Sequence, residues 1–383
     1  MKFLTSIGAV LLLLGTAAAT VPPYASDSFV PGIKGRATGF VHMEELDGRW
    51  WAIDPLGRGF YFTGIQSANM WGVRDFLTRR RVYEENCLKA YGTQARWEED
   101  CLAKLKSWGF NMLGHGCQQS LECRGLVHAR ELGMTQALCR GKDADRYICK
   151  ETTPACSAFP NVFHPDFERY CRDFARKHCA PHRDNPWVAG WYVDNELAWW
   201  GDREAHYRPR CNGLYETVAR LPALHSARRA LDAFLAQRGV AKGGEVPDAL
   251  KRAFLLHAAE RYFSVTAAAI READPNHLLL GARFAGLTGA ADPEVFTIAA
   301  KHSDVLTFNC YPWADLDRNE VRVSNDGARV PDAFGELYAR THKPFLITEW
   351  SFPALDAGLP CSGGAGQRFA TQALRAQASE LWM

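Results

Sequence analysis

Two glutamates that each end an apolar run are the residues of this chain best suited to chemistry. Residues 188–193 lead through an aspartate into Asn195 and Glu196, and residues 345–348 lead into Glu349. Glycosidases use a pair of carboxyl groups on either side of the scissile bond, one as acid/base and one as nucleophile. The pattern therefore predicts that Glu196 and Glu349 act together on a glycosidic bond.

Tryptophans accompany both glutamates. Trp199 and Trp200 follow the first glutamate, Trp350 directly follows the second, and Trp313 follows another apolar run. Apolar rings near a carboxyl raise its pKa, as a general acid needs near neutral pH, and their faces suit stacking on pyranose rings. We predict that these four side chains line a sugar-binding cleft, with core packing as the alternative for one or two of them.

The spacing of the two glutamates favours a catalytic pair over two unrelated ion pairs. Either residue alone is explained as well by a strand-end glutamate that pairs with an arginine. They stand 349 − 196 = 153 residues apart, which leaves room for three further strand–helix units. This places them on the fourth and seventh strands of a barrel, whose active site lies at the carboxyl ends of the strands.

The elements that must position these residues alternate along the chain, as is typical of a parallel α/β fold. We predict seven strands, most of them continuous apolar runs buried on both faces, at residues 59–64, 112–115, 135–138, 188–194, 278–284, 305–311 and 345–349. We predict helices at residues 96–108, from 165, at 221–237, at 248–272 and from about 368.

These elements predict a (β/α)8 TIM barrel that is truncated before strand 8. The last helix still runs at Met383, and its apolar residues suit core positions. We therefore expect residues 41–383 to form a glycoside hydrolase barrel that is incomplete at its C-terminus.

The N-terminus predicts export. A lysine at position 2, an apolar run at 7–14 and three alanines at 17–19 read as a signal peptide over residues 1–19, followed by a leader over 20–40. The protein is then secreted or periplasmic, with no membrane contact after cleavage. Twelve cysteines in an exported chain predict disulfide bonds, whereas the lack of a C-x-x-C pair argues against zinc.

Composition narrows the partners. The chain is 47% hydrophobic and carries a formal net charge of +2 without a basic block, so a nucleic-acid partner is not expected. The glycine-rich stretch at 363–366 does not directly follow a strand, and no nucleotide or other cofactor is predicted. The expected partner is a polysaccharide or oligosaccharide substrate, and the oligomeric state stays open.

The two glutamate motifs resemble the signature of the clan A retaining glycoside hydrolases. Within that clan the chain is most similar to the family 50 β-agarases, from about Gly48 to its end. The stretches that carry this similarity are residues 48–55, 193–196 with 200–201, 280–285 and 347–350.

The resemblance implies a role for each site residue. Glu196 would be the acid/base and Glu349 the nucleophile of a double displacement. Asn195 would bond the sugar 2-hydroxyl, and Tyr311 would orient the nucleophile.

Arg283 and His115 would line the same site by resemblance. Each of these assignments has a structural alternative. In the alternative interpretation, Tyr311 simply packs beside Pro312. His115 is then an ordinary loop histidine, and Arg283 only neutralises Glu349.

The sequence thus predicts a retaining enzyme that cleaves a β-linked galactan such as agarose. A different β-glycan, namely a β-galactoside, mannan or glucan, is the first alternative, because loops and not the barrel decide specificity. A non-catalytic carbohydrate-binding barrel is the second.

Overall fold

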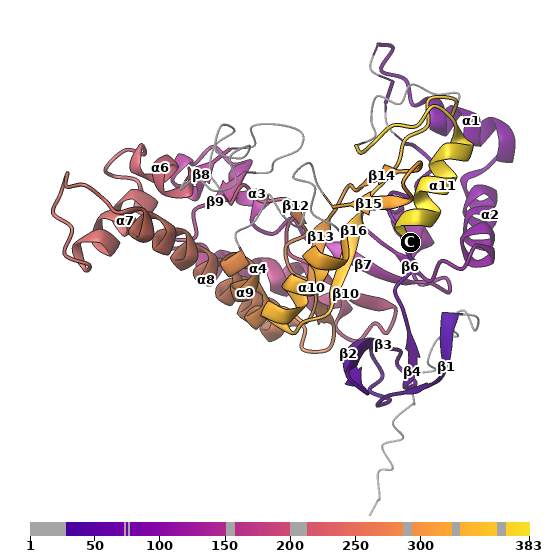
Figure 1. Cartoon of the computed structure of the whole chain (residues 1–383), viewed down its shortest axis with the longest axis horizontal. Helices are drawn as coiled ribbons and strands as arrows, with labels where there is room; N and C mark the ends of the chain where they lie inside the picture. The colour runs from indigo at the N-terminus through magenta and orange to yellow at the C-terminus, as the bar shows by residue number, and fades with distance from the viewer. Residues whose placement is uncertain are drawn as a thin grey trace, which may run out of the picture.

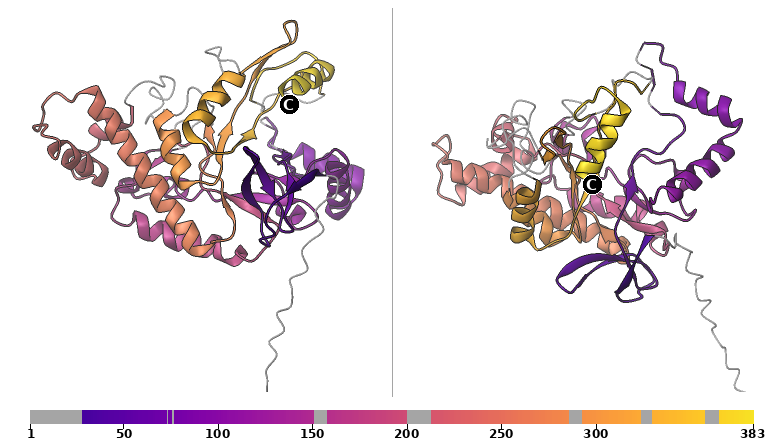
Figure 2. Two further views of the ribbon diagram at one scale, coloured as in Figure 1. Left: turned by 60° about the horizontal axis from the view of Figure 1, so that its bottom comes forward. Right: turned by 45° about the vertical axis from the view of Figure 1, so that its right-hand side comes forward.

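The computed structural model describes residues 28–72, 74–75, 77–150, 158–199, 213–285, 293–323, 330–357 and 365–383. Parallel strands run through its centre, helices cover them, and a small antiparallel sheet lies at one end (Figure 1). The two turned views show the antiparallel sheet standing apart from the long helix α8 (Figure 2).

The strands are β1 (Phe29–Lys34), β2 (His42–Leu46), β3 (Arg49–Ile53), β4 (Arg58–Phe60), β5 (Gly64–Ile65), β6 (Met112–Leu113), β7 (Val127–Glu131), β8 (Tyr147–Cys149), β9 (Phe159–Pro160), β10 (Val188–Tyr192), β11 (Leu278–Leu279), β12 (Phe284–Ala285), β13 (Leu306–Asn309), β14 (Trp313–Asp315), β15 (Glu320–Arg322) and β16 (Phe345–Glu349). The α-helices are α1 (Val82–Tyr91), α2 (Gln94–Ser107), α3 (Gln136–Cys139), α4 (Phe167–His178), α6 (Gly213–Ala219), α7 (Ser226–Ala236), α8 (Asp248–Ala273), α9 (Pro293–His302), α10 (Val330–Thr341) and α11 (Gln372–Trp382).

Two parallel sheets form the centre. One has the order β11-β10-β7-β6-β5 and the other the order β12-β13-β16, so spatial neighbours follow one another along the chain. Every pairing within them is parallel. The carboxyl ends of these strands therefore lie at the same edge of each sheet, where a site can collect side chains from several strands.

The two sheets meet where one predicted strand is split. Gly281 and Arg283 have φ angles of 72° and 29°, which end β11 and begin β12 out of line with it. The backbone still bonds across the split, because Val193 N donates to Gly281 O at 2.8 Å and Glu196 N donates to Arg283 O at 3.1 Å. Strand β10 is thus attached to both sheets.

The outer strands of the two sheets, β5 and β16, are linked by a hydrogen bond from a side chain. Gln66, which follows β5, donates from Nε2 to the carbonyl oxygen of Thr348 at 2.5 Å. Within the described ranges no strand pairs with the second edge of β16. A groove of about 370 Å³ lies between the antiparallel sheet and the start of β16, where Phe345 and Leu346 line it.

The strand predictions at 112–115, 188–194, 305–311 and 345–349 are confirmed in place, and the one at 135–138 is wrong. Residues Gln136–Cys139 form helix α3, and the third parallel strand is β7. This strand reads Val-His-Ala-Arg-Glu, so no apolar run marks it. Two of its polar residues, Arg130 and Glu131, pair with Glu122 and Arg283 of other segments, and a sequence pattern does not reveal such partners.

The predicted strand at 59–64 also divides, because β4 belongs to the antiparallel sheet β1-β4-β3-β2 and β5 to the parallel one. Strand β1 lies inside the segment predicted as a leader. The predicted signal peptide at 1–19 lies outside the described residues.

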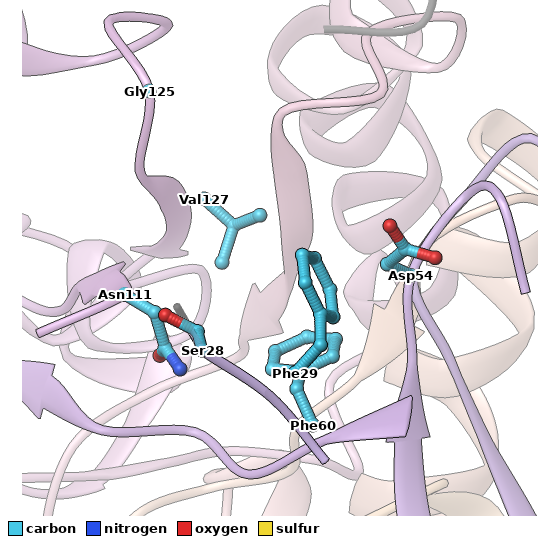
Figure 3. Close-up of a pocket in the computed structure, with 7 residues that line it drawn as sticks. All are labelled: Ser28, Phe29, Asp54, Phe60, Asn111, Gly125 and Val127. Carbon is cyan, nitrogen blue, oxygen red and sulfur yellow. The ribbon is translucent and has the colours of Figure 1, made fainter. Parts of the chain in front are cut away.

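The antiparallel sheet packs directly against the parallel strands. The Phe29 and Phe60 rings meet edge to face at 6.2 Å, and Figure 3 shows them beside Val127 of β7. The gap that these residues share with Asn111 and Asp54 has a volume of about 10 Å³. That is room for about one water, so this is a packing gap and not a ligand site.

Helices α4, α8 and α9 share the largest apolar cluster with the strands. Phe254, Tyr262 and Ile270 of α8 are fully buried in it, together with Phe284 and Phe308 of the second sheet. In the described ranges no helix combines the length and the apolarity that a membrane span requires.

The expected disulfide bonds do not occur among the described cysteines. The thiols of Cys87, Cys101, Cys117, Cys123, Cys139, Cys171, Cys179 and Cys310 are free. Several are buried, where a thiol packs as a small apolar group. Cys156, Cys211 and Cys361 lie outside the described residues.

Candidate active site

A buried carboxyl group anchors the end of β10. The side chain of Asp194 is 0% exposed and accepts hydrogen bonds from Thr135 N at 2.9 Å, Thr135 Oγ1 at 2.6 Å and Tyr262 OH at 2.8 Å. Burial nevertheless raises the pKa of Asp194 to about 6. These bonds tie the segment after β10 to α3 and α8, and so hold the next two residues in place.

Asn195 and Glu196 follow directly and are held by an asparagine from β13. Asn309 Nδ2 donates to Asn195 Oδ1 at 2.9 Å and to Glu196 Oε1 at 2.8 Å. The backbone of Glu196 has a φ of 48°, a left-handed conformation that costs energy for a residue other than glycine. The structure thus brings the first predicted glutamate to the carboxyl ends of β10 and β13 together.

The environment of Glu196 suits a proton donor near neutral pH. Burial is the largest influence and raises the pKa of this carboxyl to about 7. The hydrogen bond from Asn309 acts in the opposite direction, and the nearby charge of Glu349 raises the pKa further. A carboxyl with such a pKa is still substantially protonated at neutral pH, as a general acid must be.

Glu349, at the end of β16, is held by two stronger donors. Tyr311 OH donates to Glu349 Oε1, and Arg283 Nη2 donates to Glu349 Oε2 at 2.8 Å. Burial and the contact with Glu349 both raise the pKa of Tyr311, so its phenol remains a donor. The Glu349 side chain is 34% exposed, so it is open to solvent while both its oxygens are oriented.

Arg283 connects this glutamate to a second carboxylate. Its side chain is 0% exposed, and Nη1 donates to Glu131 Oε2 at 2.7 Å. Glu131 ends β7, and the same oxygen lies 3.0 Å from His115 Nδ1. Arg283 and His115 therefore both contact Glu131, and Arg283 is shared between the carboxylates of Glu131 and Glu349.

Asn309 and Glu131 are site residues that the sequence pattern missed. Asn309 stands two positions before Tyr311, and alternate residues of a strand point to the same face, so this spacing could have identified it. Glu131 ends a strand that was not predicted, so its position at a strand end was hidden.

The predicted tryptophans do not form one group. Trp199 is 1% exposed and stacks on Phe263 with ring centroids 5.3 Å apart. The structure places it in the core instead of the predicted sugar cleft, because its ring faces are covered by aromatic neighbours. Trp350 is partly buried and meets Trp382 edge to face at 6.3 Å.

Trp313 is the exposed member of the set. It is 51% exposed on β14 and borders a hollow of about 740 Å³ together with Arg322, Gln367 and Phe369. Trp200 lies outside the described residues.

The arrangement can supply a general acid and a nucleophile. In the part of the chain that the structure describes, no three side chains of histidine, cysteine, aspartate or glutamate are grouped to hold a metal. Arg283 donates hydrogen bonds to Glu131 and Glu349, and Asn309 donates one to Glu196.

No protein-family model matches the chain. Among curated proteins it is 22% identical over 416 residues to β-agarase B of Vibrio sp. (strain JT0107), covering 86% of this chain and 40% of that protein. It is 23% identical over 389 residues to β-agarase A of the same organism, covering 83% of this chain and 37% of that protein. The chain thus spans about two fifths of the length of these relatives.

Solved structures share its fold. An agarase named AgWH50C superposes with a TM-score of 0.71 at 20% identity, over 95% of this chain and 57% of the agarase. An exo-β-agarase gives a TM-score of 0.71 at 20% identity over 94% of this chain and 59% of its own. The protein BpGH50 gives 0.69 at 22% identity, over 92% of this chain and 73% of its own. The parallel sheets and helices of this chain therefore form a mixed α/β fold that these structures contain.

Proposed function

We propose that this chain is a glycoside hydrolase that cleaves a β-linked galactan such as agarose. One observation carries the proposal: two glutamates at strand ends are held in contrasting ways, Glu196 by a neutral amide and Glu349 by a guanidinium and a phenol. The similarity to two β-agarases supports a galactan as the substrate.

The mechanism that these contacts support is a double displacement. Glu349 attacks the anomeric carbon while protonated Glu196 gives its proton to the leaving oxygen, so the glycosidic bond breaks as a glycosyl-enzyme ester forms. Glu196, now ionised, takes a proton from water, and that water replaces Glu349 at the anomeric carbon. Tyr311 and Arg283 orient the two oxygens of Glu349 throughout.

The proposal also covers the fold and the location of the protein. The strand order β5, β6, β7, β10, β11/β12, β13, β16 suits seven successive positions of a (β/α)8 barrel, with the site at the carboxyl ends of the strands. An exported enzyme is consistent with the N-terminal sequence, because a polysaccharide is encountered outside the cell.

Reducing-sugar release from agarose and from a panel of β-galactans, mannans and glucans tests the function. The unmodified protein is compared with Glu349→Ala and Glu196→Ala. Glu272→Ala serves as the control, since Glu272 is an exposed glutamate on α8 paired only with surface arginines. We expect release from agarose that disappears in both site variants and persists in the control.

Any other result would contradict a specific part of the proposal. Release from a different glycan that depends on Glu349 would discard the galactan. Binding of a glycan without release from any would replace the enzyme by a carbohydrate-binding protein. Proton NMR of the first product separates the mechanisms, because a double displacement releases the β-anomer first and a single displacement the α-anomer.

A further inference from the structure

Among the residues that the structure describes, Asn309 is the side chain that donates to both Asn195 and Glu196 after β10. It is 2% exposed, and its Nδ2 lies 2.9 Å from Asn195 Oδ1 and 2.8 Å from Glu196 Oε1. An amide nitrogen carries two hydrogens, so this group gives one to each acceptor and has none left. The position of Asn309 therefore constrains two neighbouring side chains at once.

The orientation of this amide is determined by its surroundings. Turning it over would direct Asn309 Oδ1 at the oxygens of Asn195 and Glu196, which are acceptors. In the observed orientation Oδ1 faces the hydroxyl of Thr348 instead, at 2.9 Å. Thr348 directly precedes Glu349, so contacts run from β16 through β13 to β10.

Asn195 is held in an orientation that leaves its side-chain nitrogen available as a hydrogen-bond donor. Its Oδ1 is occupied by Asn309, and its backbone carbonyl accepts from Gln136 Nε2 at 2.9 Å. The side-chain nitrogen is then the group that Asn195 can offer to a hydroxyl of a bound sugar.

Glu196 faces groups from several elements. Asn309 comes from β13, Glu349 from β16, Arg283 from the split between β11 and β12, and Glu131 from β7. Of these, Asn309 is the one that donates a hydrogen bond to the Glu196 carboxyl. Such a bond favours the ionised form of the carboxylate.

We propose that Asn309 is a positioning residue that presents the Asn195 nitrogen to the substrate and keeps Glu196 able to ionise for the second step of the reaction. The part of this role that involves the substrate and the second step rests on the proposed function. The coupling between Asn309 and Glu196 is a property of the folded chain and can be measured without any substrate.

The test is a titration of Glu196 by NMR in protein labelled with ¹³C at glutamate Cδ. The resonance is assigned by its loss in Glu196→Gln. Removing the donor in Asn309→Ala should raise the titration midpoint by about one pH unit, the size expected of one hydrogen bond to a charged group. Asn309→Asp, which places a second carboxylate there, should raise it more.

Asn161→Ala is the matched control, because Asn161 is also a buried asparagine with three hydrogen-bond contacts, but lies by α7. It should lower the melting temperature without moving the Glu196 midpoint. An unchanged midpoint in both Asn309 variants would overturn the proposal, as would an equal shift in Asn161→Ala.

Activity distinguishes the two proposals. If agarose is hydrolysed, the alkaline limb of kcat/KM should move to higher pH in Asn309→Ala by the same amount as the NMR midpoint. If no glycan is hydrolysed and the midpoint still moves, the proposed function fails while the coupling of Asn309 to Glu196 stands.

Discussion

The ends of β10 and β16 present the same side chain in opposite surroundings. Glu196 is partly buried beside a neutral amide, and loss of solvation raises its pKa to about 7. Glu349 is also partly buried, with its side chain 34% exposed, but it is paired with the guanidinium of Arg283 and the phenol of Tyr311. The difference teaches that two identical carboxyls acquire different acidity from their surroundings, and the proposed function uses the first as proton donor and the second as nucleophile.

Glu131 weakens the contrast between the two glutamates, because it competes with Glu349 for the charge of Arg283. It takes one nitrogen of Arg283 while Glu349 takes the other, so one positive charge serves two carboxylates. The Glu349 carboxylate is therefore held in place by two hydrogen bonds while its negative charge is only partly compensated, which suits a nucleophile.

The largest expected effect comes from removing each glutamate in turn and comparing a substrate whose leaving group needs a proton with one whose leaving group does not. Glu349→Ala should lower the hydrolysis of any substrate by about 10⁴-fold, because the attacking group is gone. Glu196→Ala should lower agarose hydrolysis by about 10²–10⁴-fold, yet should spare the first step with a 2,4-dinitrophenyl β-galactoside, whose leaving group needs no proton. The measurement is the burst of released dinitrophenol.

An equal loss of the burst in both variants would contradict the assignment. Glu272→Ala on α8 should retain the full burst and controls for the loss of a surface glutamate.

The next effect tests the shared charge. Arg283→Met should lower kcat/KM by about 10²-fold and the free energy of unfolding by about 3 kcal/mol, because two carboxylates lose a buried partner. Adding Glu131→Gln should recover part of the stability, since one of those carboxylates is then gone, but not the activity. Urea unfolding and agarose kinetics measure the two quantities. Recovery of activity in the double variant would mean that Arg283 serves only Glu131.

The third effect is pH dependence. Glu196 must be protonated to act as an acid, so kcat/KM should fall about tenfold per unit above pH 7. The folded state holds this proton to a higher pH than the unfolded chain, so ionisation destabilises the fold as pH rises from about 4.5 to about 7. Relative to Glu196→Gln, the protein should therefore lose roughly 3 kcal/mol of unfolding free energy across that window.

Urea unfolding of both proteins at pH 4.5 and pH 7.5 checks this shift. An unfolding free-energy difference that stays constant between the two pH values would show that Glu196 titrates normally.

The smallest effect concerns two tryptophans. Trp199→Ala should lower the free energy of unfolding by about 3–5 kcal/mol, since the ring is 1% exposed in the core. Trp313→Ala should leave stability within about 0.5 kcal/mol, because a half-exposed ring adds little to the core, and under the proposed function it should raise KM for agarose about fivefold by removing a stacking surface. Thermal melts and steady-state kinetics distinguish them. A stable Trp199→Ala variant with a raised KM would reverse their roles.

Much of the site was readable from the chain because strand ends leave a local signature. An apolar run followed by a polar residue identified Glu196 and Glu349 without any tertiary information, and the family resemblance added Tyr311. The same criterion failed for β7, whose polar residues break the apolar run, and with it Glu131 was missed.

The tertiary structure decided which polar residues meet. Asn309 carries no signature of its own beyond its spacing from Tyr311, and its importance comes from contacts with residues more than a hundred positions away. Trp199 shows the converse, since its place beside a glutamate suggested a sugar contact and packing against α8 put it in the core.

The sequence by itself determined the alternation of strands and helices, the two glutamates and their order along the chain, because these depend on local hydrophobic pattern and on distance along the chain. Only the tertiary structure decided the sharing of Arg283, the orientation of Asn309 and the different hydrogen-bond partners of the two glutamates. The physical reason is that burial and hydrogen-bond partners arise from segments far apart in sequence, and these set the charge that each carboxyl carries.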